Sequence, residues 1–174
     1  QATGWDLGTV SPPLKAYFDQ LTDKNLRILI PGCGFGHEAI YLEQQGFTHI
    51  TVIDLVDEAL DLVRVNAPNV NCVVGDYFNF SSTFDRIIEQ TLFCAIDPRL
   101  RQQYIQKTAS LLADNGKYVG LLFNRDFEGG PPFGGSTQEY QTYFSKHFHS
   151  FSMETCYNSA QPRSGNEVFF IAKK

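Results

Sequence analysis

The sequence has no excess of basic residues, no long apolar run and no clustered cysteines, and each absence excludes a class of protein. Its 174 residues include 14 Lys and Arg against 19 Asp and Glu, which gives a net charge of -5 at pH 7. Nucleic-acid binders and membrane-surface proteins need a basic face, so neither kind of partner is expected. No apolar run approaches the roughly 18 residues of a membrane-spanning helix. The first residues lack the charged and apolar regions of a signal peptide, so none is expected.

The cysteines are far apart in the chain and form no CxxC pair. They stand at Cys33, Cys72, Cys94 and Cys156, a spacing typical of reduced thiols in a cytoplasmic protein. No histidine joins them at metal-ligand spacing, so no metal site is expected. No repeat, low-complexity tract or linker divides the chain, and residues 1–174 are predicted to form a single domain. Because no long apolar stripe is left over, we expect a monomer.

Strand-like and helix-like segments alternate along most of the chain. Strands are expected at 27–31, 49–53, 71–75, 84–89, 117–123, 148–158 and 167–172. Helices are expected at 12–21, 37–45, 57–66, 99–113 and 137–146. This alternation implies a parallel sheet with helices on both faces. The last two strands, expected to be joined by a short turn, must be antiparallel.

A glycine-rich corner, residues 32–36, follows the first predicted strand in "RILIPGCGFGHEAI". Its glycines Gly32, Gly34 and Gly36 let the backbone approach a ligand closely, and the next helix offers free N–H groups there. The dinucleotide motif G-x-G-x-x-G/A has Gly or Ala where this chain has His37. The spacing therefore counts against NAD, and the corner alone could be only a tight turn.

Acidic residues end the next two predicted strands. Asp54 follows Gly32 by 22 residues, where a carboxylate can accept hydrogen bonds from both hydroxyls of a ribose. In "VGDYF", Asp76 is placed to contact an adenine amino group, with Tyr77 or Phe78 beside the ring. Ligands of parallel sheets lie over the carboxyl ends of the strands. Although Asp54 alone could be a helix cap, the three strand ends together predict a nucleoside site.

Longer motifs resemble one family in its order along the chain. They are "GWDLGTVSPPL", "RILIPGCGFGHEAIYL", "GDYF", "FDRIIEQTLFCAIDPRLRQQY" and "GGPPFG". They are similar to the thiopurine S-methyltransferase family of class I S-adenosylmethionine (SAM)-dependent methyltransferases, including its thiol and halide methyltransferase branch. The resemblance implies an α/β, three-layer Rossmann-like methyltransferase fold. Its sheet would have seven strands, mostly parallel, with a C-terminal antiparallel hairpin.

The resemblance also implies SAM as the cofactor, S-adenosylhomocysteine as its product, and a set of residues around it. The expected cofactor-binding residues are Trp5, Gly32, Cys33, Gly34, Asp54, Leu55, Asp76, Tyr77, Glu89, Thr91 and Leu92. The expected pocket for a small-molecule acceptor is formed by Tyr17, Phe18, Gln90, Phe93, Pro132 and Phe133. Residues 1–24 would be a lid segment, which is short beside that of the relatives. Gln90 stands where thiopurine enzymes have Arg, which favours the thiol and halide branch.

Several of these residues also have a structural interpretation. Trp5 could be core, Glu89 could cap a helix or loop, and Cys33 is favoured as a small residue in a tight corner rather than a nucleophile. No catalytic side chain is assigned, because in-line methyl transfer from a sulfonium to a thiolate or halide needs alignment rather than a strong base. An O- or N-methyltransferase, or a SAM-binding protein without turnover, are the alternatives.

Overall fold

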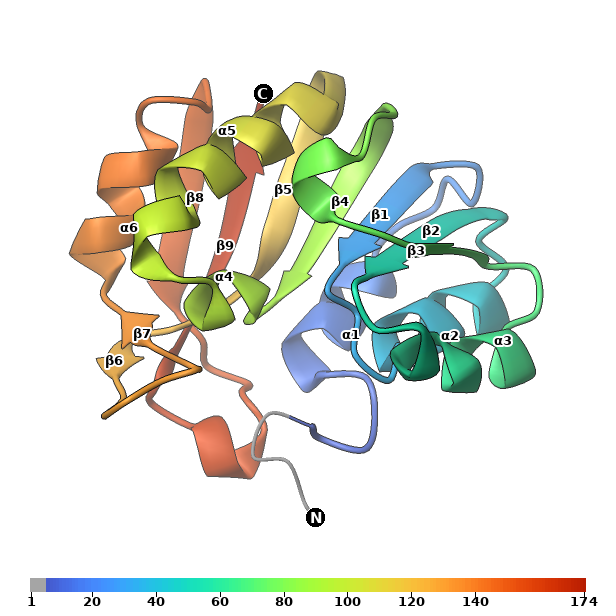
Figure 1. Cartoon of the computed structure of the whole chain (residues 1–174), viewed down its shortest axis with the longest axis horizontal. Coiled ribbons are helices and arrows are strands. Elements are labelled where there is room, and N and C mark those ends of the chain that lie inside the picture. The colour runs from blue at the N-terminus through green and yellow to red at the C-terminus, as the bar shows by residue number, and fades with distance from the viewer. Residues whose placement is uncertain (1–5) are drawn as a thin grey trace. The chain divides into compact units, whose positions relative to one another are not determined.

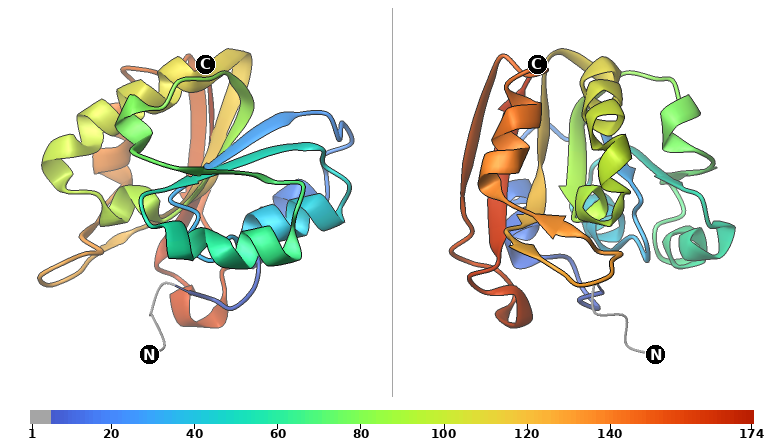
Figure 2. Two further views of the ribbon diagram at one scale, coloured as in Figure 1. Left: turned by 45° about the vertical axis from the view of Figure 1, so that its right-hand side comes forward. Right: turned by 60° about the vertical axis from the view of Figure 1, so that its left-hand side comes forward.

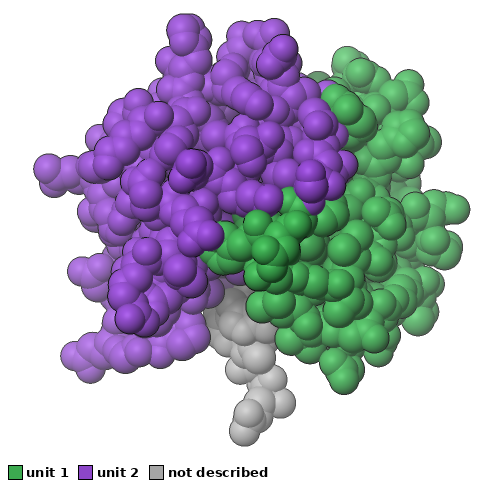
Figure 3. All heavy atoms as spheres, turned by 45° about the horizontal axis from the view of Figure 1, so that its top comes forward, with its two compact units in different colours: residues 1–80 green, residues 81–174 purple. Residues whose placement is uncertain are grey.

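The computed structural model describes residues 6–174 (Figure 1). By its internal contacts the chain divides into two compact units, residues 1–80 and 81–174, which Figure 3 colours separately. We call them unit 1 and unit 2 and describe each by itself. Among the described residues, no helix is long and apolar enough to cross a bilayer.

Unit 1 is built on three parallel strands. They are β1 (Arg27–Pro31), β2 (His49–Asp54) and β3 (Asn71–Val74), with β2 paired to both others. The last four residues of β1 are buried, as expected for a strand of a parallel sheet. The helices of this unit are α1 (Pro12–Phe18), α2 (His37–Gln44) and α3 (Asp61–Asn66), with 3-10 turns η1 (Asp57–Leu60) and η2 (Tyr77–Asn79). Helices α2 and α3 lie side by side (Figures 1 and 2).

Unit 2 is built on four strands and two longer helices. Strand β4 (Phe84–Gln90) is parallel to β5 (Leu112–Phe123), and β9 (Glu167–Lys173) is antiparallel to both β5 and β8 (Ser150–Thr155). Helices α5 (Arg101–Leu111) and α6 (Thr137–Phe144) pack on each other (Figure 1). The shorter elements are α4 (Leu92–Ala95), η3 (Pro98–Leu100), η4 (Gln161–Arg163) and the two-stranded pair β6 (Arg125–Asp126) and β7 (Gly134–Gly135).

Aromatic side chains form the core of unit 2. The ring of Phe170 on β9 lies 4.7 Å from that of Tyr118 on β5 and 5.0 Å from that of Phe144 on α6, measured between centroids. All three side chains are fully buried. The contacts fix α6 against the strands, and so fix the end of the glycine- and proline-rich segment that precedes this helix.

The predicted fold class is confirmed. All seven predicted strands are present, three in unit 1 and four in unit 2, mostly parallel and ending in an antiparallel pair. The short turn expected between the last two strands is wrong: residues 156–166 connect β8 to β9 and include η4. The predicted helices 57–66 and 99–113 each begin with a 3-10 turn. The sequence did not predict α4, β6 or β7.

Candidate functional site

The glycine corner joins β1 to α2 in a backbone conformation that favours glycine. Gly32, Gly34 and Gly36 have φ of 54°, 51° and 70°, in the left-handed region that other L-residues rarely adopt. The N–H of Gly32 donates to the Ile53 carbonyl at 2.7 Å, and that of Gly36 donates to the Cys33 carbonyl at 2.9 Å. Backbone hydrogen bonds, one to β2 and one within the corner, therefore hold its conformation, and α2 begins directly after Gly36.

The third glycine of the corner serves packing between helices. A Cβ added to Gly36 would lie 2.1 Å from Cγ2 of Val63, a fully buried residue of α3. The N-terminus of α2 can approach α3 only because position 36 has no side chain. This contact accounts for Gly36 without a ligand, and leaves Gly32 and Gly34 as the candidate ligand-facing positions.

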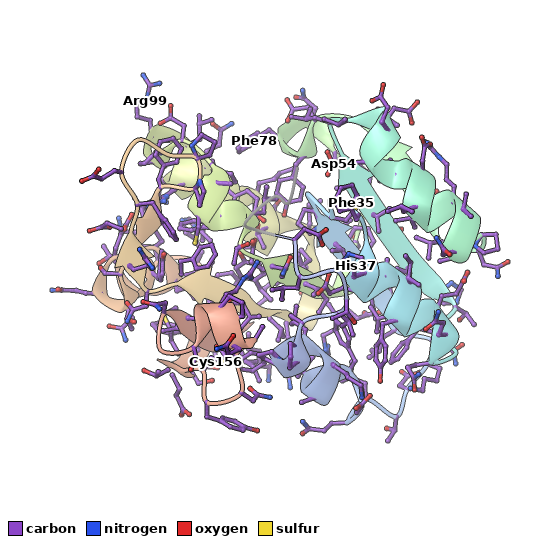
Figure 4. All side chains as sticks on the ribbon, turned by 90° about the horizontal axis from the view of Figure 1, so that it is seen from below. Phe35, His37, Asp54, Phe78, Arg99 and Cys156 are labelled. Carbon is purple, nitrogen blue, oxygen red and sulfur yellow. The ribbon has the colours of Figure 1, made fainter. Side chains whose placement is uncertain are left out.

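Asp54, at the end of β2, lies against the glycine corner (Figure 4). One carboxylate oxygen, Oδ2, accepts from the Gly34 N–H at 3.3 Å, and Oδ1 accepts from the Val56 N–H at 3.0 Å. The following side chain, Leu55, is 73% exposed. A half-buried carboxylate and an exposed apolar side chain thus stand next to each other beside the corner.

The end of β3 is tied to the same region through its backbone. The Gly75 N–H donates to the Asp54 carbonyl at 2.9 Å. Asp76 caps η2: its Oδ1 accepts from the Phe78 N–H at 2.9 Å and its Oδ2 from Asn79 Nδ2 at 3.0 Å. The structure therefore brings together the three strand ends predicted to form the nucleoside site.

The N-terminal segment is attached to the start of α2. Trp5 lies outside the described residues, but Oδ1 of the adjacent Asp6 is 3.0 Å from His37 Nε2. The buried Glu38 carboxylate accepts from the Ser11 N–H at 3.0 Å. No sequence motif marks this contact between His37 and Asp6, since the pair joins positions 31 apart in the chain.

The thiol of Cys33 is unsuited to nucleophilic chemistry. Burial raises the pKa of Cys33 to about 12, and the negative charge of the nearby Asp54 carboxylate acts in the same direction. The thiolate is the nucleophilic form of cysteine, and almost none is present at neutral pH. The preferred interpretation of Cys33, a small residue in a tight corner, agrees with this environment.

In unit 2, Glu89 on β4 holds a carboxylate with no solvent exposure. Its Oε2 accepts from the hydroxyls of Tyr104 at 2.7 Å and Tyr118 at 2.8 Å, and its Oε1 accepts from the Phe93 N–H at 3.0 Å. Burial raises the pKa of Glu89, while these hydrogen bonds act in the opposite direction. The side chain caps α4; its contact with the methionine amino group of SAM stays a prediction.

Between Glu89 and α4 the backbone makes a strained corner. Thr91 has φ of 64° and is 6% exposed, and its N–H donates to the Leu121 carbonyl at 3.1 Å. The left-handed conformation costs a residue with a Cβ about 1–2 kcal/mol. Strain of this kind persists where the surroundings hold it, here through the Glu89 carboxylate and β5. Gln90 and Leu92, on either side of Thr91, are half-buried.

The predicted acceptor residues fall into different environments. Phe93 is fully buried, with ring centroids of Tyr104, Tyr140 and Tyr143 at 5.8, 5.6 and 5.8 Å. Pro132 and Phe133 are half-buried, and the Phe133 N–H donates to the Cys94 carbonyl at 2.7 Å, next to Phe93. In unit 1, Phe18 lies in the core and stacks on Tyr41, and Tyr17 is half-buried beside it.

Two titratable groups close to Phe93, Cys94 and Tyr140, are held in their protonated forms. Burial raises the pKa of Cys94 to about 11 and also raises that of Tyr140, whose hydroxyl donates to the Phe123 carbonyl at 2.6 Å. Neither group is suited to act as a base at neutral pH. In the described part of the chain, no group of three or more His, Cys, Asp or Glu side chains is placed to hold a metal ion.

Comparison with known proteins assigns the chain to a family. Residues 1–171 match the model of the family described as Thiopurine S-methyltransferase (TPMT). The chain belongs to this family. The recognition from sequence motifs is thereby confirmed, and with it the expected enzyme class, a methyltransferase.

Curated relatives agree with this assignment, and a solved structure shares the fold. The chain is 29% identical over 183 residues to "Probable thiol methyltransferase 2" of Arabidopsis thaliana and 27% identical over 182 residues to "Thiocyanate methyltransferase 1" of Brassica oleracea. Each alignment covers 99% of this chain and 80% of the relative. A SAM-dependent methyltransferase from Mesorhizobium loti shares the fold, with a TM-score of 0.74, 13% identity, and coverage of 94% of this chain and 96% of that one.

Proposed function

We propose that the chain uses SAM to methylate a small soft nucleophile: a thiol, bisulfide, a halide or a thiopurine. The observation that carries the proposal is the Asp54 carboxylate held against the glycine corner, 3.3 Å from the Gly34 N–H. Membership of the methyltransferase family supports SAM as the donor, and the geometry at Asp54 supports this corner as the place for its nucleoside.

The polar and apolar groups around Asp54 in unit 1 fit the nucleoside part of SAM. A carboxylate offers about four lone-pair positions, and the two protein N–H groups on Asp54 use one on each oxygen. Acceptor capacity therefore remains for both ribose hydroxyls. The exposed Leu55 offers an apolar surface to adenine, with Asp76 and Tyr77 assigned to the adenine edge. We assign the methionine part to Gly32, Cys33 and Gly34.

The remaining cofactor residues are carried over from the family resemblance. Trp5 would flank the bound cofactor, and Glu89, Thr91 and Leu92 are assigned to it as well. The Glu89 carboxylate already accepts three hydrogen bonds from unit 2. A contact between its side chain and the methionine amino group would compete with these protein donors for the carboxylate oxygens.

The chemistry asks little of the protein beyond alignment and exclusion of water. When bound, SAM would supply a methyl carbon on a sulfonium sulfur; a bond from the acceptor to that carbon forms as the carbon–sulfur bond breaks, and the thioether that leaves is neutral and needs no proton. A thiol of pKa about 8.5 is already partly ionised at neutral pH, and bisulfide or a halide needs no base. Holding two reactants in line can supply about 7–11 kcal/mol. The aromatic residues Phe93 and Phe133 would provide the apolar wall around the acceptor.

Two observations favour a thiol or halide acceptor. The relatives aligned over nearly the whole chain are named for thiol and thiocyanate methylation. Position 90 is Gln, where the thiopurine branch has Arg. A cytoplasmic location and a monomeric state, expected from the cysteines and the apolar pattern, accompany the proposal as predictions.

Calorimetry with SAM tests the cofactor half. Asp54→Ala removes the proposed ribose acceptor and should weaken SAM binding at least about tenfold, or about 1.4 kcal/mol. The control is Asp57→Ala, which removes a carboxylate three positions further on that is 63% exposed and paired with Arg64. Its affinity for SAM should equal that of the wild type. Equal affinity in Asp54→Ala would remove this residue from the site, and binding of NAD without binding of SAM would contradict the proposal.

An acceptor panel tests the transfer half. Labelled methyl groups are counted after incubation with a thiol, bisulfide, iodide, a thiopurine, and oxygen and nitrogen nucleophiles. We expect transfer to the sulfur and halide acceptors. Transfer only to oxygen or nitrogen would favour the alternative methyltransferase, and SAM binding without any transfer would favour a binding protein.

A further inference from the structure

Arg101, the first residue of α5, is a buried arginine that contacts three other elements. It is 3% exposed; Nη1 donates to Glu139 Oε1 on α6 at 2.7 Å, and Nη2 donates to the Gly134 carbonyl on β7 at 2.6 Å. Its guanidinium carbon lies 5.1 Å from the ring centroid of Phe93 on α4. Its Nε has no hydrogen-bond partner among the described residues, and the ring face provides the remaining contact.

The segment that Arg101 holds is "GGPPFGG", residues 129–135, which carries the proposed acceptor wall. Its C-terminal end has almost no freedom. A Cβ on Gly134 would lie 1.9 Å from the Arg125 carbonyl oxygen, and one on Gly135 would lie 2.6 Å from Tyr140 Oη. The Phe133 N–H donates to the Cys94 carbonyl at 2.7 Å. The position of Phe133 therefore depends on how firmly β7 is held.

Glu139 pairs with Arg101, although its place in the first turn of α6 would also allow a capping interaction. Ser136 and Glu139 have the S-x-x-E spacing of a capping box, and the Glu139 N–H donates to Ser136 Oγ at 3.2 Å. In a capping box the glutamate side chain returns to the N-cap N–H. Here it accepts from Arg101 instead, so the first turn of α6 is joined to α5 and β7.

We propose that Arg101 is a positioning residue for acceptor specificity. By bonding to β7 and α6 while lying over Phe93, it fixes the spacing between Phe93 and Phe133, and so the size of acceptor that can reach the methyl group. The two diverging bonds need the planar fork of a guanidinium; a lysine ammonium is a point charge that cannot reproduce it. The inference rests on the proposed function.

The test compares acceptors of different size in the full chain with saturating SAM. We expect Arg101→Met to change the ratio of kcat/KM for bisulfide to that for a thiopurine about fivefold or more, because a small misplacement of a substrate wall is costly in rate. Arg101→Lys should restore part of the ratio. SAM affinity, measured separately by calorimetry, should change less than the acceptor ratio, since the side-chain bonds of Arg101 go to Glu139 and Gly134 rather than to the proposed cofactor residues.

Arg163→Met is the matched control. Arg163 is 4% exposed, is paired with Glu167 at 3.0 Å, and lies over the ring of Phe123. Its loss should destabilise the protein as much as the loss of Arg101 but leave the acceptor ratio unchanged. If Arg101→Met does not fold, Glu139→Gln is the second variant, since Glu139 is 34% exposed on its side chain and Gln keeps a hydrogen-bond acceptor.

Hydrogen exchange gives a readout that needs no turnover. The Phe133 amide should exchange faster in Arg101→Met than in the wild type or in Arg163→Met. An unchanged acceptor ratio and unchanged exchange in folded Arg101 and Glu139 variants would overturn the inference while leaving the proposed function intact. A wild type that binds no SAM or methylates no acceptor would overturn the proposed function, and the specificity role with it.

Discussion

Asp54 and Glu89 both stand at the end of a parallel strand, but their carboxylates occupy opposite environments. Asp54 is half-buried and accepts two backbone N–H groups, which leaves acceptor capacity for a ligand. Glu89 is fully buried and accepts two tyrosine hydroxyls and a backbone N–H. The sequence predicted both as cofactor residues, because position in a strand does not reveal which side chains surround a carboxylate.

Glu89 should make folding stability depend on pH. Burial raises its pKa above the value of about 4.3 for a free glutamate. As pH rises from that value, the unfolded chain loses this proton first, so the folded state loses stability until the folded pKa is passed. Glu89→Gln cannot titrate, and its free energy of unfolding relative to the wild type should increase between pH 5 and pH 8, as measured by urea denaturation.

The matched control for this titration is Glu154→Gln, at an exposed position of β8. It removes the same charge from the surface and should follow the wild type at both pH values. A difference between Glu89→Gln and the wild type that stays constant with pH would show that the Glu89 carboxyl titrates alike in the folded and unfolded chain.

Other contacts of the site could not be predicted residue by residue. The glycine corner, Asp54 and Asp76 were found because their signal lies in short motifs at strand ends. The His37–Asp6 and Arg101–Glu139 pairs join positions 31 and 38 apart, and no local pattern marks such partners. The S-x-x-E spacing of Ser136 and Glu139 is typical of a capping box and carries no information about Arg101.

At the scale of elements, length decided which predictions succeeded. The strands of the sheet and the helices α2, α5 and α6 were predicted because each contains several apolar residues at a regular spacing. Helix α4 has four residues and β6 and β7 have two each, too few to show a period. The linker from β8 to β9 was mistaken for a turn because its residues 156–158 continued the strand-like pattern.

The contact between α2 and α3 gives a prediction at the same scale. Gly36→Ala adds a Cβ at φ of 70° and 2.1 Å from Val63 Cγ2. The left-handed conformation costs about 1–2 kcal/mol and overpacking a further 1–3 or so. We expect the free energy of unfolding to fall by about 2–5 kcal/mol in a denaturant titration.

A double-mutant cycle separates the two causes. Val63→Ala removes the clashing methyl groups and creates a cavity, so it destabilises the protein when made alone. Combined with Gly36→Ala, it should destabilise by less than the sum of the single changes, with a coupling of about 1 kcal/mol or more. Additive effects would mean that the backbone conformation alone requires glycine at position 36.

At the scale of the whole molecule, ligand binding should appear as thermal stability. A ligand that binds only the folded state stabilises it by RT ln(1 + [L]/Kd), about 2.7 kcal/mol at a hundredfold excess over Kd. For a chain of this size each kcal/mol corresponds to roughly 2–4 °C in Tm. SAM at that excess should therefore raise the Tm by about 5–11 °C, while NAD at the same concentration should leave it unchanged.

The SAM-induced rise in Tm also tests the role of Asp54. If Asp54→Ala weakens SAM binding tenfold, the same SAM concentration is only about ten times its Kd, and the stabilisation falls to about 1.4 kcal/mol. The rise in Tm should then be about half that of the wild type, while Asp57→Ala should keep the full rise. Equal shifts in all three proteins would mean that SAM stabilises the chain without using the carboxylate at the glycine corner.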